Sequence, residues 1–244
     1  MKECSKAVSR RLHDPDFMGR FFAGVGLDIG GKPDPLSLYQ ELFPLISNVR
    51  VWDMEDGDAE HLAGVADASF DFVHSSHCLE HLNDVPRGLA NWFRVLKPGG
   101  YLVVTVPDED LYEQGVFPSL YNRDHKATFT IFKEHSWSSV SYNVVDLLKG
   151  LGHEAQTLKV ELVLTGYRLQ WPRFDQTLTP LGESSIEFVV RKRTSEEVER
   201  FGQLERPKNI DKVTRRYLNQ YLADQRALRE LARAQPPFRD ESEI

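Results

Sequence analysis

Short groups of glycine and polar residues stand at points in this sequence where a small ligand could be bound. A glycine pair, Gly30 and Gly31, directly follows the apolar stretch 24–29, which carries Asp28 near its end. Glycines in such a turn allow the backbone to approach a ligand closely, and the N–H groups of a following helix attract an anion. A glycine pair is also common in ordinary tight turns, so this segment leaves both interpretations open.

An acidic residue ends the next apolar stretch. Asp53 follows residues 49–52, at the carboxyl edge where doubly wound sheets bind their ligands. A carboxylate in this position could accept hydrogen bonds from both hydroxyl groups of a ribose. The alternative is a carboxylate that caps a helix or lies in solvent on a loop.

The elements that would position these residues alternate between strands and helices, which favours a parallel sheet covered on both faces. The first part of the chain predicts strands over 24–29, 49–52, 70–74 and 101–106, and helices over 35–46 and 83–96. The second part predicts a helix over 139–152, an antiparallel pair over 158–165 and 186–190, and a helix over 210–234. The predicted fold class is therefore α/β: Rossmann-like and doubly wound, mostly parallel, with an antiparallel closing strand and a C-terminal helical extension.

Four blocks occur in a fixed order: GDAEHL at 57–62, SFDFV at 69–73, LEHL at 79–82 and RVLKPGG at 94–100. As a set they resemble the class I S-adenosylmethionine-dependent methyltransferases, over about residues 24–106. The short glycine turn followed by Asp-Pro is most similar to family members from polysaccharide and lipopolysaccharide biosynthesis. The resemblance implies methyl transfer from S-adenosylmethionine, with S-adenosylhomocysteine as the product.

The resemblance also implies which residues bind the cofactor. The glycine turn would hold its methionine part, the acid after the second strand its ribose, and the Asp-Ala pair of the GDAEHL block its adenine. The predicted cofactor-binding residues are Asp28, Gly30, Gly31, Lys32, Asp53, Met54, Asp58, Ala59, Glu60 and Ser75.

The sequence departs from the family pattern in two places. Lys32 and Asp34 stand where the family usually carries further glycines. Only 27 positions separate Gly30 from Gly57, where the family usually has room for an extra helix and strand. The predicted sheet is therefore shortened between its first and fourth family strands, and Asp53 could align with a later strand instead of the ribose-binding one.

His77 is the leading candidate for a general base, because the resemblance places it just past a strand end, near the reactive methyl group. A histidine there could instead hydrogen-bond a neighbouring backbone group at the start of a helix. Asp108 and His125 are further catalytic candidates, in a polar region over 107–137 that would face the acceptor. Its carboxylates and histidines could bind a divalent metal, but they show no fixed ligand spacing, so no metal site is predicted.

Composition narrows the partners and the location. The chain has 37 acidic and 30 basic residues and a formal charge of −7, which disfavours non-specific binding to nucleic acid or anionic membranes. It contains no apolar run long enough to span a membrane. Its two cysteines form no CxxC motif, so a reducing compartment, the cytoplasm, is the predicted location.

Together these observations predict a helical lead-in over 1–22, a methyltransferase domain over 23–193 and a helical extension over 194–244. The apolar stripe of the extension would cover the domain or a second copy in a homodimer; it comprises Val213, Tyr217, Tyr221, Leu228 and Leu231. The predicted function is methyl transfer to a small-molecule or saccharide acceptor, at oxygen. The alternative is a methyltransferase-like scaffold that has lost catalysis.

Overall fold

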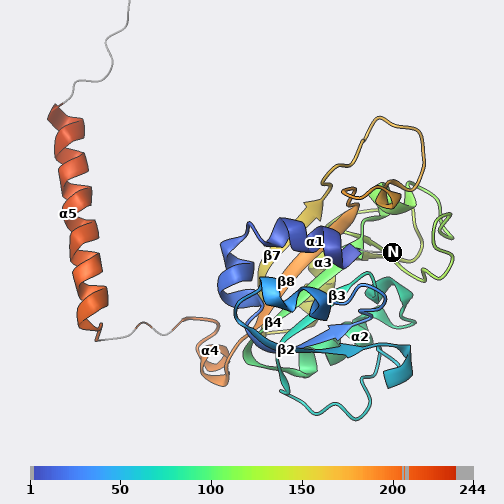
Figure 1. Cartoon of the computed structure of the whole chain (residues 1–244), viewed down its shortest axis with the longest axis horizontal. Helices are drawn as coiled ribbons and strands as arrows, with labels where there is room; N and C mark the ends of the chain where they lie inside the picture. The colour runs from blue at the N-terminus through green and yellow to red at the C-terminus, as the bar shows by residue number, and fades with distance from the viewer. Residues whose placement is uncertain (1–2, 205, 207–208, 235–244) are drawn as a thin grey trace, which may run out of the picture. The chain divides into compact units, whose positions relative to one another are not determined.

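The most apolar stretches of the chain form a six-stranded sheet in the order β2-β1-β3-β4-β8-β7. The computed structural model describes residues 3–204, 206 and 209–234. Neighbouring strands from β2 to β4 run parallel, whereas β8 is antiparallel to both β4 and β7 (Figure 1). The strands are β1 (Gly24–Ile29), β2 (Ile46–Trp52), β3 (Phe70–Ser76), β4 (Leu96–Pro107), β7 (Ala155–Val163) and β8 (Ser185–Lys192). This arrangement confirms the predicted fold class, including the antiparallel closing pair.

The order of the first strands shows where the sheet is shortened. β1 pairs with β2 on one side and with β3 on the other, so the segment between Gly30 and Gly57 contributes one strand. Ile29 is the register partner of Trp52. Asp53 therefore follows the strand that lies directly beside β1, close to the glycine turn.

The two faces of the sheet are covered by different elements. Alternate side chains of β4 point to opposite faces of the sheet and join two separate hydrophobic clusters. Leu102 and Val104 pack on the face covered by helices α2 and α3, whereas Val103 packs on the face covered by helix α1. The α-helices up to residue 203 are α1 (Glu3–Arg11), α2 (Val85–Arg94), α3 (Val144–Gly150) and α4 (Ser195–Glu199). A π-helical turn, η1 (Phe17–Phe21), adds aromatic side chains to the α1 face.

Short elements make up most of the remaining structure. Four 3-10 turns are η2 (Leu36–Leu42), η3 (Met54–Asp56), η4 (Leu79–His81) and η6 (Gln176–Leu178), and a second π-helical turn is η5 (Glu109–Glu113). A small parallel pair, β5 (Thr128–Thr130) and β6 (Ser141–Asn143), lies outside the main sheet.

Three predicted elements differ in detail. The helix expected over 35–46 is the 3-10 segment η2, which ends before Phe43 takes an extended conformation; the following Pro44 disfavours helical geometry there. The helix expected to reach residue 96 ends at Arg94, and the Lys-Pro-Gly-Gly segment lies within β4, where the register with β3 shifts. The helix expected over 139–152 is limited to α3.

The chain divides into two units, residues 1–203 and 204–244. In the second unit, α5 (Lys212–Ala234) forms where the sequence predicts a helix. The last residues of the predicted extension, 235–244, lie outside the described residues. Within the described part of the chain, no helix combines the length and apolar character needed to cross a membrane.

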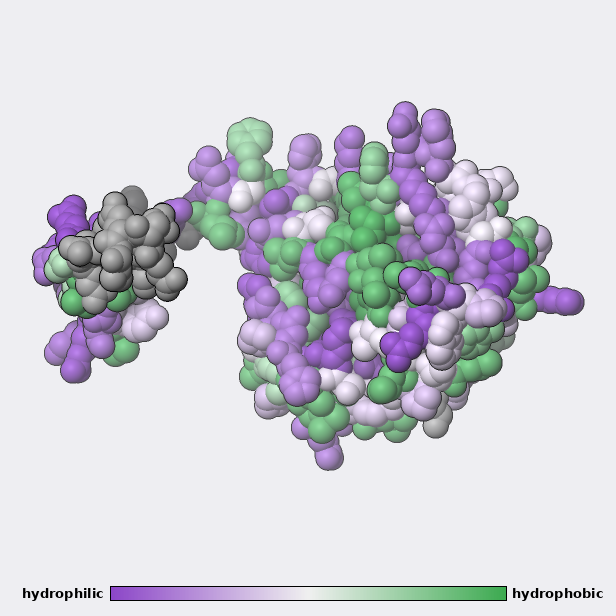
Figure 2. All heavy atoms as spheres, turned by 90° about the horizontal axis from the view of Figure 1, so that it is seen from above, coloured by the Kyte–Doolittle hydropathy of each residue, from purple (hydrophilic) through white to green (hydrophobic). Residues whose placement is uncertain are grey.

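The surface of the first unit carries both hydrophobic and hydrophilic residues. Figure 2 shows hydrophobic residues gathered near the middle of one face, between mainly hydrophilic ones. Exposed large hydrophobic side chains are numerous in the segment that joins β7 to β8: Leu164, Leu169, Trp171, Leu178 and Leu181. Such residues are available to contact an acceptor or a partner.

Candidate functional site

Two adjoining cavities lie at the carboxyl ends of β1, β2 and β3. The larger, which we call the outer cleft, has a volume of about 550 Å³, and the smaller, the inner chamber, has about 190 Å³. Many predicted cofactor-binding residues line the outer cleft: Gly30, Lys32, Asp53, Met54, Asp58, Ala59 and Glu60. The four residues that line both cavities are Gly30, Lys32, His77 and His81.

The glycine turn presents bare backbone to both cavities. Gly30 has a φ of +69°, and a Cβ atom there would lie 2.6 Å from the side chain of Cys78. Glycine is therefore required both by conformation and by space. The next residue but one, Lys32, donates its backbone N–H to Asp53 Oδ2 at 2.9 Å and pairs its ammonium group with Glu55.

Asp28 lies behind the turn and holds it in place. Its side chain is buried, Oδ2 accepts the backbone N–H of Leu36 at 2.7 Å, and Oδ1 is 2.6 Å from His74 Nδ1. The guanidinium group of Arg11 lies 2.9 Å from His74 Nε2. Because a guanidinium can only donate, Nε2 must accept, and Nδ1–H donates to Asp28. Asp28 thus contacts the turn and the inner chamber, with both oxygens bonded within the protein.

Asp53 takes the capping role that the sequence offered as the alternative to ribose binding. It caps η3, because Oδ1 accepts the N–H of Met54 at 2.9 Å and Asp56 bonds back to the Asp53 backbone. Its other oxygen accepts from Lys32, as described above. Each carboxylate oxygen has two lone pairs, so both retain capacity for a ligand in the outer cleft that Asp53 lines.

The residues of the GDAEHL block differ in where they point. Asp58 is exposed at the cleft, and its Oδ1 accepts the N–H of Glu60 at 2.8 Å. Glu60 is buried, and its carboxylate accepts the backbone N–H groups of Asn83 and Asp84 at 3.1 and 2.9 Å. Glu60 therefore mainly fixes the start of α2. The carbonyl of Ala59 accepts from Trp92 Nε1 at 2.8 Å.

Two other predicted cofactor-binding residues lie at opposite extremes of exposure. Met54 is 91% exposed at the edge of the outer cleft, where a flexible side chain could cover a flat ring. Ser75 is fully buried, donates to the carbonyl of Ile29 at 3.0 Å, and is not among the residues lining either cavity. The structure thus assigns Ser75 a bond between β1 and β3.

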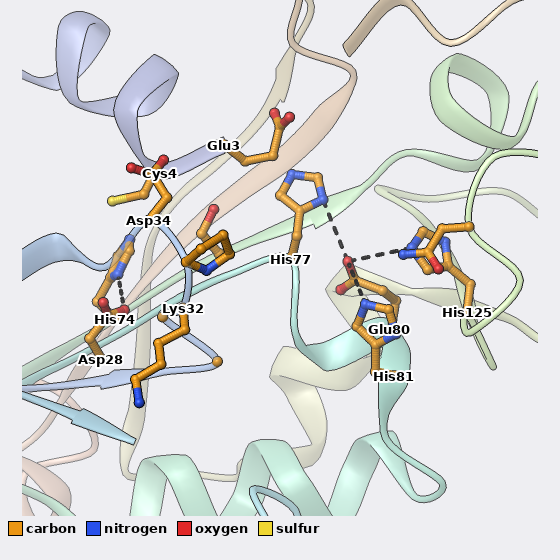
Figure 3. Close-up of a pocket in the computed structure, with 15 residues that line it drawn as sticks. Glu3, Cys4, Asp28, Lys32, Asp34, His74, His77, Glu80, His81 and His125 are labelled. Atoms are coloured by element: carbon orange, nitrogen blue, oxygen red, sulfur yellow. Dashed lines mark hydrogen bonds and ion pairs between the residues drawn. The ribbon is translucent and has the colours of Figure 1, made fainter. Parts of the chain in front are cut away.

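His77 lies where the two cavities meet. Its backbone has a φ of +55°, which turns the chain sharply after β3. Its Nε2 is 3.0 Å from Ser185 Oγ, and its Nδ1 is 3.4 Å from Glu80 Oε1 (Figure 3). Burial by itself lowers the pKa of His77, but the nearby Glu80 carboxylate outweighs burial and raises that pKa overall. A raised pKa makes the neutral imidazole a better proton acceptor.

Several residues of the inner chamber were not predicted to belong to the site. Glu3 and Cys4 reach it from α1, His74 from β3, and Glu80 and His81 from η4. The LEHL block contains Glu80 and His81, so a signal for these two was present in the sequence. Nothing local marks α1, because its place over the chamber depends on tertiary packing.

The two remaining catalytic candidates are separated by the fold. His125 is buried in the wall of the inner chamber, with Nδ1 2.6 Å from Glu113 Oε1. Asp108 is also buried, but it lines neither cavity; it caps η5 by accepting the N–H groups of Asp110 and Leu111, each at 3.0 Å. The geometry favours a structural role for Asp108.

Asp108→Asn is expected to stabilise the protein at neutral pH. Burial raises the pKa of Asp108 to about 6, so between about pH 4 and 6 the folded state holds more protons than the unfolded state. Stability therefore falls as pH rises through this interval, and asparagine, which can still cap η5, avoids the cost. We expect a gain of about 1–3 kcal/mol in the free energy of unfolding at pH 7.5.

Urea denaturation of both proteins at pH 7.5 and at pH 4 would check this expectation. The difference between them should disappear at pH 4, where wild-type Asp108 is protonated in the folded state. A variant that is less stable than wild type at pH 7.5 would contradict it.

Comparison with known proteins identifies a domain within the chain. Residues 36–104 match the family model described as a methyltransferase domain, and this segment includes the Asp53 turn, the GDAEHL block and His77. This segment of the chain therefore resembles a methyltransferase domain, and the surrounding fold is that of a solved S-adenosylmethionine-dependent methyltransferase. No curated protein sequence matches this methyltransferase significantly.

Several solved structures of methyltransferases are similar to this chain. A S-adenosylmethionine-dependent methyltransferase from Archaeoglobus fulgidus is 21% identical, with a TM-score of 0.51 over 79% of this chain and 95% of its own. A complex of the Trm112 methyltransferase activator and a methyltransferase from Haloferax volcanii matches at 15% identity, TM-score 0.46, over 78% and 90% of the two chains. A phosphoethanolamine-type N-methyltransferase from Haemonchus contortus, solved with S-adenosylhomocysteine, matches at 17% identity, TM-score 0.42, over 63% and 38%.

The outer cleft of the methyltransferase fits S-adenosylmethionine. Its volume of about 550 Å³ lies within the range of small-molecule sites, about 300–1,000 Å³. The glycine turn leaves backbone open to the ligand, Asp53 offers acceptor capacity for hydroxyl groups, and Met54 and Trp52 supply apolar surface. The outer cleft therefore has the size and the lining groups to hold S-adenosylmethionine, the cofactor that the sequence predicted.

Proposed function

We propose that this methyltransferase transfers the methyl group to a hydroxyl oxygen of a small molecule or saccharide. One observation carries the proposal: His77 lines both the outer cleft, which fits the cofactor, and the inner chamber. His77 could therefore accept a proton at the boundary between the cleft for the methyl donor and the polar chamber, where the substrate that receives the methyl group could bind.

The chain's own residues supply positioning and proton transfer. When bound, the cofactor supplies a sulfonium methyl group that an oxygen can attack. Asp53, Asp58 and the Gly30 turn would hold the nucleoside and methionine parts in the outer cleft. His77 would take the hydroxyl proton, with Ser185 at 3.0 Å keeping its ring in place. Positioning of both reactants could contribute roughly 7–11 kcal/mol at best.

The lining of the inner chamber supports an acceptor rich in hydroxyl groups. Glu3, Asp34 and Asn122 supply hydrogen-bonding groups, and His125 lies on the opposite wall. Glu3 and Asp34 are buried and already accept bonds from Lys6 and from the Ser5 N–H, and their remaining lone pairs could accept further bonds from a ligand hydroxyl. Polysaccharide biosynthesis and the cytoplasm stay predictions; the free state of Cys4 and Cys78 supports a reducing compartment.

A scaffold protein without catalysis is the second candidate function, favoured by the glycine turn's departure from the family pattern. Calorimetry with S-adenosylhomocysteine separates the two. Micromolar binding would support the enzyme, and absence of binding at millimolar concentration would support the scaffold. A homodimer through α5 stays a prediction under either function.

Asp53→Ala is expected to weaken S-adenosylhomocysteine binding by more than about tenfold, because it removes the ribose acceptor and frees the backbone of Lys32. The change is measured as the dissociation constant by calorimetry. Asp67→Ala is a matched control, since Asp67 lines neither cavity. A dissociation constant equal to that of wild type would move the ribose contact to another residue.

A further inference from the structure

Among the described residues, one buried carboxylate beside the candidate site accepts no hydrogen bond. Glu80 is fully buried in the wall of the inner chamber. Neither Oε1 nor Oε2 accepts a hydrogen bond from any residue that the structure describes. A carboxylate in a protein interior that accepts no hydrogen bond is costly, so a cation bound at this position would be stabilising.

Imidazole rings surround this carboxylate. Besides His77, the Nε2 atoms of His125 and His81 lie 3.9 and 4.0 Å from Glu80 Oε1. Figure 3 shows three rings directed at Glu80: those of His77 and His81 come from the same segment as Glu80, and that of His125 comes from a segment farther along the chain. The distances for His125 and His81 are too long for hydrogen bonds, and they leave space between the groups.

The two longer contacts belong to rings whose other nitrogen is already bonded. His125 Nδ1 lies 2.6 Å from Glu113 Oε1, and His81 Nδ1 lies 2.9 Å from Asp124 Oδ2. A carboxylate at Nδ1 fixes a proton on that nitrogen and leaves the lone pair of Nε2 directed into the cluster. A carboxylate behind a histidine ligand is the usual outer partner in metal sites.

The spacing also suits a metal ion. Ligand atoms of Glu80, His81 and His125 all lie within 4.8 Å of one another. Two ligands of a tetrahedral zinc ion are about 3.4 Å apart, given metal–nitrogen distances of about 2.0–2.1 Å. The two Glu80–histidine distances would have to shorten by roughly half an ångström, and the widest ligand separation by up to about 1.4 Å, to bring the three groups onto one ion.

We propose that Glu80, His81 and His125 bind one divalent transition-metal ion, which holds the acceptor hydroxyl in the inner chamber. Two imidazoles and one carboxylate are the ligands of catalytic zinc and of non-haem iron sites. Mg²⁺ and Ca²⁺ prefer oxygen ligands, so they suit this cluster less well. Three protein ligands leave coordination positions open, and all three residues line the inner chamber. The acceptor role rests on the proposed function, whereas the metal site does not.

The test is metal binding to the full chain, purified without a histidine tag and stripped with a chelator. Zn²⁺, Mn²⁺, Co²⁺ and Mg²⁺ are titrated separately by calorimetry, and melting temperatures are measured with and without each ion. We expect one transition-metal ion per chain, a higher melting temperature with it, and weaker binding of Mg²⁺. Visible absorption of the Co²⁺ form should report nitrogen and oxygen ligands.

Variants assign the ligands. Glu80→Gln removes the anionic ligand at constant size and should weaken Zn²⁺ binding roughly 100-fold or more, while Glu113→Gln, behind His125, should weaken it about 10–100-fold. If Glu80→Gln does not fold, His81→Asn replaces it, because the His81 side chain is 26% exposed. His135→Asn is the matched control, since that side chain is 90% exposed.

The outcomes separate this site from the proposed function. If the stripped protein binds S-adenosylhomocysteine but no transition metal at millimolar concentration, the metal site is refuted and the function stands. Unchanged Zn²⁺ affinity in both Glu80→Gln and His81→Asn also refutes it, as does Mg²⁺ binding as tight as Zn²⁺ binding. Metal binding lost in the variants but not in His135→Asn confirms the site, even if no hydroxyl acceptor is methylated.

Discussion

His77→Asn is expected to lower the turnover of methyl transfer by about 10²–10⁴-fold, the usual contribution of a general base. Asparagine is chosen because His77 has a φ of +55°, a conformation that asparagine adopts more readily than most residues. The backbone turn after β3 should therefore survive. The amide cannot accept the hydroxyl proton, so the loss should fall on turnover.

The measurement compares turnover with the dissociation constant of S-adenosylhomocysteine. We expect the dissociation constant to change by less than threefold or so, because the ring is not among the predicted cofactor contacts. His135→Asn, at an exposed histidine, controls for loss of an imidazole elsewhere. Equal turnover in wild type and His77→Asn would remove His77 as the base, and a large loss of cofactor affinity would make it a binding residue.

Arg11→Met is expected to lower the free energy of unfolding by about 3–5 kcal/mol, the cost of breaking a buried ion pair. Arg11 is fully buried between α1 and the sheet, and its guanidinium bonds Glu187, His74 and Thr105 at 2.8–3.1 Å. Burial raises the pKa of Glu187, but Arg11 and its other cationic neighbours outweigh burial and hold that pKa well below its ordinary value. Removing Arg11 leaves a buried carboxylate with weaker compensation.

Two neighbours limit the loss. Arg10 and Lys159 also contact Glu187, at 2.9 and 3.1 Å, so the lower end of the range is expected. The same change leaves His74 Nε2 without its donor, which should loosen Asp28 and the glycine turn. Weaker S-adenosylhomocysteine binding should accompany the loss of stability.

Urea denaturation measures the effect, with Arg20→Met as the control. Arg20 belongs to the adjacent η1 turn, and its pair with Asp16 is about half exposed, so its replacement should change stability by less than about 1 kcal/mol. An Arg11→Met protein as stable as wild type would show that the buried network contributes nothing to folding.

The sheet could be predicted from the sequence because its signals are local. Apolar runs such as 101–106 indicate strands on their own, and the alternation of strands with helices indicated a mostly parallel sheet. The antiparallel pair was also predicted, since 158–165 and 186–190 lack a helix between them. Details that depend on neighbouring residues could not be predicted. Pro44 limits η2 to a 3-10 segment, and the Lys97–Gly100 segment forms part of β4 instead of ending α2.

The candidate site was only partly accessible to the same reasoning. Residues in the turns after β1 and β2 were identified, because the carboxyl edge of a parallel sheet collects them. The sequence could not show that Glu60 bonds the start of α2, or that Ser75 bonds Ile29, because both depend on the direction of the side chain. It also could not bring His125 to Glu80, which lie 45 residues apart in the chain.

The position of α1 has a practical consequence for handling the protein. Glu3 and Cys4 form part of the chamber wall, and the backbone N–H of Ser5 is bonded to Asp34 at 2.8 Å. A polyhistidine tag attached near these wall residues would introduce foreign imidazoles beside the groups proposed to bind a metal. Such a tag could capture nickel or zinc during purification and imitate, or mask, the behaviour of the native groups.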